Sequence, residues 1–194
     1  LQGIVIVGDI DVDAVEAKLK TIFADVQKAV NPAERVYYPV ADNKEPIVAI
    51  GTDKEVDDPS IEVYFKQDAT PDSEKNNVGY LASQYMTSMI TSMLNARLSE
   101  LTQSANPPFT RAYSSYGNFF VAKTKEALNL SASSKADGIE KALKVLLQEA
   151  ERARRFGFTE SEYARARANY LQRLESAYNE REKTKHGSYV REYV

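Results

Sequence analysis

Three aspartates in the stretch GDIDVD have a spacing that two kinds of binding site also use. Asp9, Asp11 and Asp13 stand at alternate positions between an apolar run and an amphipathic segment. A dinucleotide site would need the pattern G-x-G-x-x-G here, so that the backbone can approach a pyrophosphate, and three carboxylates would instead repel phosphate. No G-x-x-x-x-G-K-S/T pattern occurs in the chain. These residues therefore argue against nucleotide binding.

The same aspartates match positions one, three and five of a calcium-binding EF-hand loop, but the rest of that loop does not fit. Ala14 stands where glycine makes the sharp turn, and Lys20 stands where a bidentate glutamate would bind the ion. Acidic side chains are also favoured at helix N-termini, because they cap free N–H groups and offset the helix dipole. The sequence therefore predicts a helix start here, with Asp13 and Glu16 as its capping box.

Residues for metal binding or nucleophilic catalysis are scarce. The chain has no cysteine and a single histidine, His186, which lies in the polar stretch EKTKHGSYV. A zinc site built from cysteine and histidine needs three or four such ligands, and a serine or cysteine triad needs a histidine base. We therefore expect no catalytic residue, no metal ligand and no cofactor-binding residue in this segment, and we expect His186 to be exposed.

Composition narrows the class of protein further. The 194 residues are 43% hydrophobic and 27% charged, which is typical of a globular domain with a sizeable core. The formal net charge is -3 and the basic residues are dispersed, so no basic patch indicates nucleic-acid binding. No apolar run approaches the roughly 20 residues that a membrane-spanning helix needs.

Five segments have the composition of β-strands. Ile4–Val7 and Ile47–Ile50 are short apolar runs rich in β-branched residues, and SIEVYFKQ alternates apolar with polar residues. The stretches TRAYSSYGNFFVAKT and EALNLSAS predict the two strands of a hairpin whose turn lies near Lys123–Glu126. The sequence therefore predicts several short strands, at least two of them antiparallel.

Four other segments have the periodicity of amphipathic helices. One follows the aspartate turn, and a long one keeps an apolar face that includes Met93. The third ends at Gly157, a helix-terminating glycine, and the fourth begins with a capping box made by Thr159 and Glu162.

The predicted order of elements is β-α-β-β-α-β-β-α-α. This order favours an α+β fold, a mostly antiparallel sheet with helices packed on it, over a doubly wound nucleotide fold, which needs strict alternation of strands and helices. We expect residues 1–158 to form a single α+β domain. We expect residues 159–194 to form a C-terminal helix that leads towards a further domain of a longer polypeptide.

Three stretches together resemble one enzyme family. They are IVIVGDIDVDAVEAKLKTIFADV, MLNARLSELTQSANPPFTRAYSSYGNFFVAKTKEALNLSAS and the helical region from IEKALKVLLQ to ESAYNEREKT. In this order they resemble the insulinase/pitrilysin-type zinc metallopeptidases (inverzincins), and LSELTQSANPPF is most similar to the long bacterial members. The catalytic domain of that family carries H-x-x-E-H, which is absent here. The segment therefore resembles the noncatalytic second domain of the N-terminal half, with a fold of the processing-peptidase (metallohydrolase-like) type.

The resemblance implies a function for the whole protein rather than for this segment alone. It implies a zinc-dependent endopeptidase whose domains form a chamber around the peptide, with zinc held elsewhere in the parent protein, and an isolated segment that is inactive. The implied partners are the peptide substrate, which adds as a strand to a sheet edge, and the other domains of the parent chain. Neither nucleic acid nor a membrane span is implied, and the long bacterial members favour a periplasmic location.

Candidate substrate-facing residues lie on the strand TRAYSSYGNFF. The resemblance places Arg111, Tyr113 and Tyr116 on a strand where arginine could hold a carboxylate or carbonyl of the peptide and tyrosine could pack on its side chains. The alternative is a core strand whose aromatic residues pack under a helix.

Two other functions stay open from the sequence. The same fold could serve as a scaffold or assembly domain in a family member that lacks the zinc site, or the chain could be an independent ligand-binding α+β domain. An intact H-x-x-E-H in the parent protein would favour the peptidase over both.

Overall fold

The structure is a computed structural model that describes residues 3–27, 30–56 and 58–193. It contains two compact units, one made of Val36–Asn169 and the other of Leu1–Arg35 with Tyr170–Val194. The second unit holds helix α1 (Val12–Ile22), the end of α4 (Glu160–Asn179), the short 3-10 helix η2 (Arg181–Lys183) and α5 (His186–Tyr193). The proposed boundary between residues 158 and 159 stays a prediction.

The aspartate turn does cap a helix, but through a different residue from the one predicted. Asp11 is the N-cap of α1, and its Oδ1 accepts a hydrogen bond from the Ala14 N–H at 3.0 Å. Asp13 lies inside the first turn, where its charge favours the positive end of the helix dipole. The predicted capping box of Asp13 and Glu16 is therefore wrong by two residues, and Glu16 instead forms an ion pair with Lys20 at 2.5 Å.

Two of the five predicted strands do not form. Ile4–Val7 and Ile47–Ile50 have no strand assignment, and the side chains of Ile4 and Ile47 are 56% and 77% exposed. Apolar β-branched residues favour an extended backbone, but a strand exists only where a neighbouring strand takes up its N–H and C=O groups. Neither segment has such a neighbour among the described residues, so the predicted order of elements loses these two strands.

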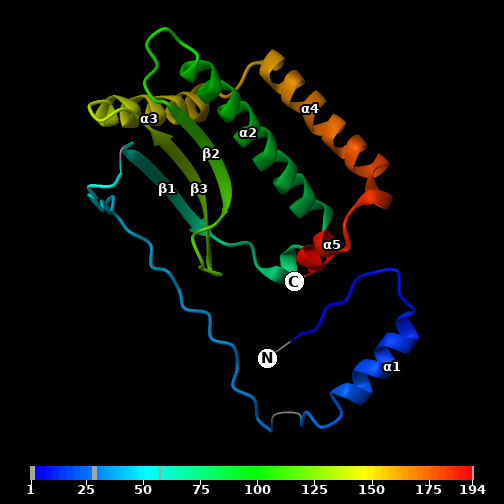
Figure 1. Cartoon of the computed structure of the whole chain (residues 1–194). Coiled ribbons are helices and arrows are strands. Elements are labelled where there is room, and N and C mark those ends of the chain that lie inside the picture. The colour runs from blue at the N-terminus through cyan, green and yellow to red at the C-terminus, as the bar shows by residue number, and fades with distance from the viewer. Residues whose placement is uncertain (1–2, 28–29, 57, 194) are drawn as a thin grey trace. The chain divides into compact units, whose positions relative to one another are not determined.

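The larger unit has an antiparallel sheet of three strands, β1 (Ser60–Asp68), β2 (Arg111–Asn118) and β3 (Lys125–Ser133). Their spatial order is β1-β3-β2, so the predicted hairpin of β2 and β3 is confirmed and β1 pairs with the other side of β3. The predicted turn is too late in the chain, because residues 119–124 connect the strands and Lys125 and Glu126 already belong to β3. Helix α2 (Val78–Thr102), preceded by the 3-10 turn η1 (Asp72–Glu74), packs beside β2, and α3 (Ile139–Phe156) packs against β3 (Figure 1). The predicted α+β class is confirmed.

The core lies between α2, α3 and one face of the sheet. Its buried members are Leu94, Leu98, Phe109, Leu130, Ala132, Ala142 and Leu146. Met93, on the predicted apolar face of α2, is only 6% exposed. Because each fully buried leucine stabilises the fold by about 1.5–3 kcal/mol, this cluster dominates the stability of the unit. No helix in the described part of the chain is both long and apolar enough to cross a membrane.

Helix α3 ends at the predicted glycine. Gly157 has a φ of 66°, in the left-handed region that glycine enters without a steric cost, and its N–H donates to the Ala153 carbonyl at 2.9 Å. The ring of Phe158 then lies 4.5 Å from the Arg97 guanidinium of α2. The chain therefore turns from α3 towards α4 directly beside α2.

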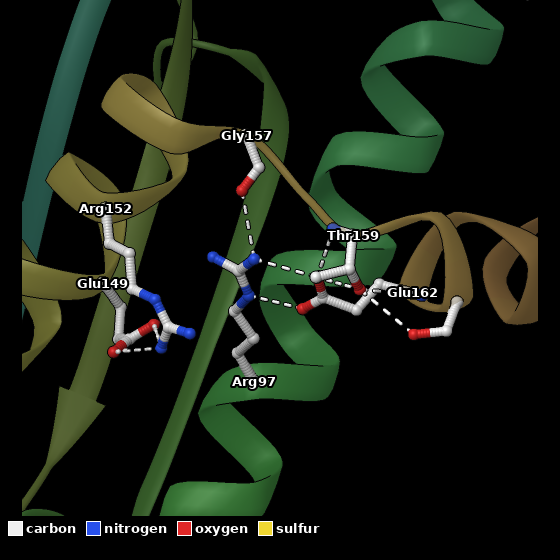
Figure 2. A network of polar contacts seen from close by, with 7 residues as sticks. Arg97, Glu149, Arg152, Gly157, Thr159 and Glu162 are labelled. Carbon is white, nitrogen blue, oxygen red and sulfur yellow. Dashed lines mark hydrogen bonds and ion pairs between the residues drawn. The ribbon is translucent and has the colours of Figure 1, made fainter.

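Arg97 ties α2 to this turn (Figure 2). Its Nε and Nη2 donate to the two carboxylate oxygens of Glu162 at 2.5 and 2.9 Å, and Nη2 also donates to the Gly157 carbonyl at 3.0 Å. Glu162 closes the predicted capping box, because its Oε2 accepts from the Thr159 N–H at 2.7 Å and its own N–H donates to Thr159 Oγ1. The guanidinium is the main reason why the pKa of Glu162 falls to about 2.

Candidate functional site

The sheet has two faces of different character, because successive side chains of a strand point to opposite sides. Side chains on one face, such as those of Leu130 and Ala132, pack in the core, and we call this the covered face. We call the other one the open face. The register gives its members as Ser60, Glu62, Tyr64, Lys66 and Asp68 of β1, Arg111, Tyr113, Ser115 and Gly117 of β2, and Lys125, Ala127, Asn129, Ser131 and Ser133 of β3. Glu62, Arg111, Tyr113 and Ser115 are exposed on this face, so this part of the surface is available to a ligand. Tyr64 and Lys66 are partly buried, and the β3 residues Lys125, Ala127 and Ser131 are buried.

The three residues predicted to face substrate are divided between the two faces. Arg111 and Tyr113 lie on the open face, where both are exposed. Tyr116 lies on the covered face, where its hydroxyl donates to Glu126 Oε2 at 2.7 Å and accepts from Gln67 Nε2. Burial and the Glu126 carboxylate raise the pKa of Tyr116 to about 12. The structure therefore brings Arg111 and Tyr113 to one surface and separates Tyr116 from them.

Tyr64 belongs to the same surface, although the sequence did not single it out. Its hydroxyl donates to Glu62 Oε2, and this hydrogen bond, together with burial, raises the pKa of Tyr64 to about 12. Its ring contacts Phe119 and Phe120, with ring centres 5.5 and 5.0 Å apart. The alternation in SIEVYFKQ already placed Tyr64 opposite to the apolar residues, so this signal was available in the sequence.

Residues 38–42 bind one end of the open face. Lys125 Nζ pairs with Asp42 Oδ1 and with Asp68 Oδ1, each at 2.7 Å. Lys66 Nζ donates to the Ala41 carbonyl at 3.0 Å. Both cations at this end are therefore already paired within the chain, which leaves Arg111, at the other end, as the cation best placed to meet a ligand.

The outer edge of β2 is blocked at its centre by a side chain of α2. Asn95 Oδ1 accepts from the Ser114 N–H at 2.6 Å, and Asn95 Nδ2 donates to the Ser114 carbonyl at 2.9 Å. These are the two backbone groups that a further strand would use at this position. One carboxamide therefore takes the place of a neighbouring strand.

The outer edge of β1 has no such cover. At the strand ends, the Ala69 N–H donates to the Thr124 carbonyl and the Ser134 N–H donates to the Pro59 carbonyl. Odd-numbered residues of β1 therefore direct their backbone groups to β3, and the backbone groups of Glu62, Tyr64 and Lys66 point away from it. Within the described residues, no backbone hydrogen bond reaches them from a further strand. β1 is therefore the edge at which an extended peptide can add.

The open face carries hydrogen-bonding and aromatic side chains. The open face offers a guanidinium, phenols, hydroxyls and a carboxamide, and no histidine or cysteine, since the one histidine lies in α5. Among the residues that the structure describes, no group of three or more histidine, cysteine, aspartate or glutamate side chains could hold a metal ion. The donor set therefore does not fit zinc, which needs three or four such ligands.

Comparison with known proteins gives a family and a fold. Residues 3–170 match the family described as Peptidase M16 inactive domain. The first half of the periplasmic protease PqqL from Escherichia coli has a similar fold, with a TM-score of 0.74 and 19% identity over 93% of this chain and 38% of that one. A predicted insulinase family protease from Yersinia pestis also has a similar fold, with a TM-score of 0.76 and 11% identity over 96% of this chain and 39% of that one. No curated protein sequence matches the chain.

Proposed function

The chain belongs to the peptidase M16 inactive-domain family, and from this premise we propose that it is a noncatalytic domain of a zinc-dependent endopeptidase. In this proposal the open face and the β1 edge form part of the wall of a peptide-enclosing chamber, and the zinc site lies elsewhere in the parent protein. The match over residues 3–170 carries the proposal. The chain spans well under half of the solved structures that it resembles, which agrees with a role as one domain among several.

The surface chemistry supports peptide as the ligand. Along one side of an extended peptide, every second residue presents its N–H and C=O groups. The β1 edge presents the complementary groups at Glu62, Tyr64 and Lys66. Arg111 and Tyr113 on the open face could contact a carboxylate, a carbonyl or an apolar side chain of the same ligand. One similar structure is a periplasmic protease, and we propose the periplasm for this protein too.

The test uses the full-length protein that carries this sequence. We expect it to hold one zinc ion and to cleave a quenched fluorescent peptide, and we expect both properties to be lost after chelation and restored by zinc. Metal analysis and initial rates measure them. A well-folded full-length protein with neither zinc nor turnover would contradict the proposal and point to the scaffold function.

A further inference from the structure

A recess lies in the open face, above the middle of the sheet. We call it the aromatic recess; its lining includes Tyr64, Ser115, Gly117, Phe120, Ala127 and Asn129. Tyr64 pairs with Asn129, and Asn129 with Ser115, so these three residues form one row across the strands. The recess exists because Gly117 has no side chain, and a Cβ placed there would meet no atom within 4 Å.

One residue that lines the recess, Asn129, carries a buried acceptor without a donor among the described residues. Asn129 Oδ1 is buried, and no group in the described residues donates a hydrogen bond to it. A buried acceptor without a partner destabilises the state in which it stays unpaired, so a ligand that supplies a donor gains affinity here. The torsion that turns a carboxamide is soft, so the oxygen can reach a donor placed in the recess.

The walls of the recess are aromatic. Phe120, in the loop between β2 and β3, lies with its ring centre 5.0 Å from that of Tyr64 and 4.8 Å from that of Phe119. Its φ is 51°, which is unusual for a bulky residue, and the residue lines the recess. The side chain remains 65% exposed, so it has a surface left to contact a ligand.

Size and chemistry together select an occupant. The recess has a volume of about 250 Å³. A cavity of about 150 Å³ in another protein binds benzene, so this recess has room for one aromatic ring with a polar substituent and not for two. We propose that the aromatic recess binds one tyrosine or tryptophan side chain of an extended peptide, whose O–H or N–H donates to Asn129 Oδ1. The peptide as ligand rests on the proposed function.

The chain itself allows a clean measurement, because it contains no tryptophan. N-acetyltryptophanamide can therefore be excited selectively in the presence of the whole chain. We expect saturable binding with a blue-shifted emission and a dissociation constant of about 1 mM, the weak affinity that one side chain can supply. Its N-methylated indole analogue, which has no ring N–H, should bind at least about fivefold more weakly. Absence of saturable binding, or equal affinity for both probes, would overturn the proposal.

Two variants locate the site. Gly117→Val should weaken binding of N-acetyltryptophanamide at least about tenfold while the melting temperature stays equal or rises, because valine favours a strand. Asn129→Leu should remove the preference for the indole N–H, so that both probes bind equally. Ser60→Val, at the far end of β1, is the matched control and should leave both affinities unchanged. Full binding by folded Gly117→Val would place the site elsewhere and refute the inference.

This experiment is separate from the test of the proposed function, since it needs neither zinc nor turnover. Loss of the indole preference in Asn129→Leu establishes the recess even if the full-length protein proves inactive. A full-length zinc peptidase whose isolated segment shows no saturable binding would keep the proposed function and remove the recess.

Discussion

Leu130 and Asn129 are neighbours on β3, yet they belong to surfaces with opposite roles. Leu130 is fully buried in the core with α2 and α3. Asn129 points to the open face, where its carboxamide oxygen has no donor among the described residues. The covered face therefore supplies most of the stability, and the open face is the surface that we propose for binding. Substitutions on the open face and in the helices that pack on the covered face should separate these properties.

The largest effect should come from a charge in the core. Met93→Asp would bury a carboxylate without a partner, and we expect a loss of about 3–5 kcal/mol of stability, enough to unfold the chain. Ser115→Asp places the same carboxylate on the open face and should cost less than about 1 kcal/mol. Thermal melts followed by circular dichroism compare the two. Equal losses would show that the open face is also packed.

Removing Arg97 should have the next largest effect. Arg97→Met leaves the largely buried Glu162 carboxylate without its cation, and we expect a loss of about 3 kcal/mol. Arg152→Ala, which removes an exposed arginine with a weak 3.5 Å ion pair on α3, should cost less than about 0.5 kcal/mol. Urea unfolding of both variants measures the difference. If both changes cost the same, the contact between α2 and the α3–α4 turn would not stabilise the covered face.

The same ion pair predicts a dependence on pH. The pKa of Glu162 is about 2 in the folded chain and 4.5 is its ordinary value, so its stabilising contribution is present above pH 4.5 and is lost as the pH falls towards 2. The difference in stability between the parent and Arg97→Met should therefore shrink between about pH 6 and about pH 3. Urea midpoints at the two values measure it, and a constant difference would contradict the assigned pKa.

A smaller effect should follow from uncovering the edge of β2. Asn95→Leu leaves the Ser114 N–H and C=O without their partners, which should cost about 1–3 kcal/mol. Ser114→Ala keeps both backbone hydrogen bonds and should cost less. Hydrogen exchange of the Ser114 amide provides the direct readout. Unchanged protection in Asn95→Leu would mean that another group covers this edge.

The smallest effect on stability should come from Arg111 and Tyr113. Arg111→Ala and Tyr113→Phe should change the stability by less than about 0.5 kcal/mol, since both side chains are exposed. In the full-length protein we expect kcat/KM for a peptide to fall about tenfold for Arg111→Ala, whereas Arg152→Ala leaves it unchanged. Intact stability with intact kinetics would remove Arg111 from the proposed chamber wall.

Local signals in the sequence were sufficient for much of the covered face. The stop at Gly157, the capping box of Thr159 and Glu162, the apolar face with Met93 and the β2–β3 hairpin all depend on residues close together in the chain, and all are confirmed. The family resemblance is confirmed as well. The alternation of side chains along a strand also predicts that Tyr113 and Tyr116 lie on opposite faces, because they are an odd number of residues apart.

Other features depend on contacts that no local pattern encodes. Ile4–Val7 and Ile47–Ile50 have the composition of strands, but composition does not supply a neighbouring strand, and neither one forms. Asn95 meets Ser114 across 19 positions of the chain, and Arg97 meets Glu162 across 65. Such pairs are decided by how helices pack on the sheet. The recess in the open face likewise depends on a missing side chain at Gly117 and on a loop that folds over it.

Asn95 also limits how copies of this chain can associate. Endless stacking of molecules through their sheets requires two free edges on each one, so that every new copy leaves an edge for the next. Here Asn95 blocks the edge of β2 at Ser114, whereas no further strand among the described residues pairs with the edge of β1. Pairing of β1 with β1 of a second copy would use the free edge of both molecules at once. Association through the sheet edges would then end at two copies, because the Asn95 carboxamide occupies the backbone groups of Ser114 that a third copy would need.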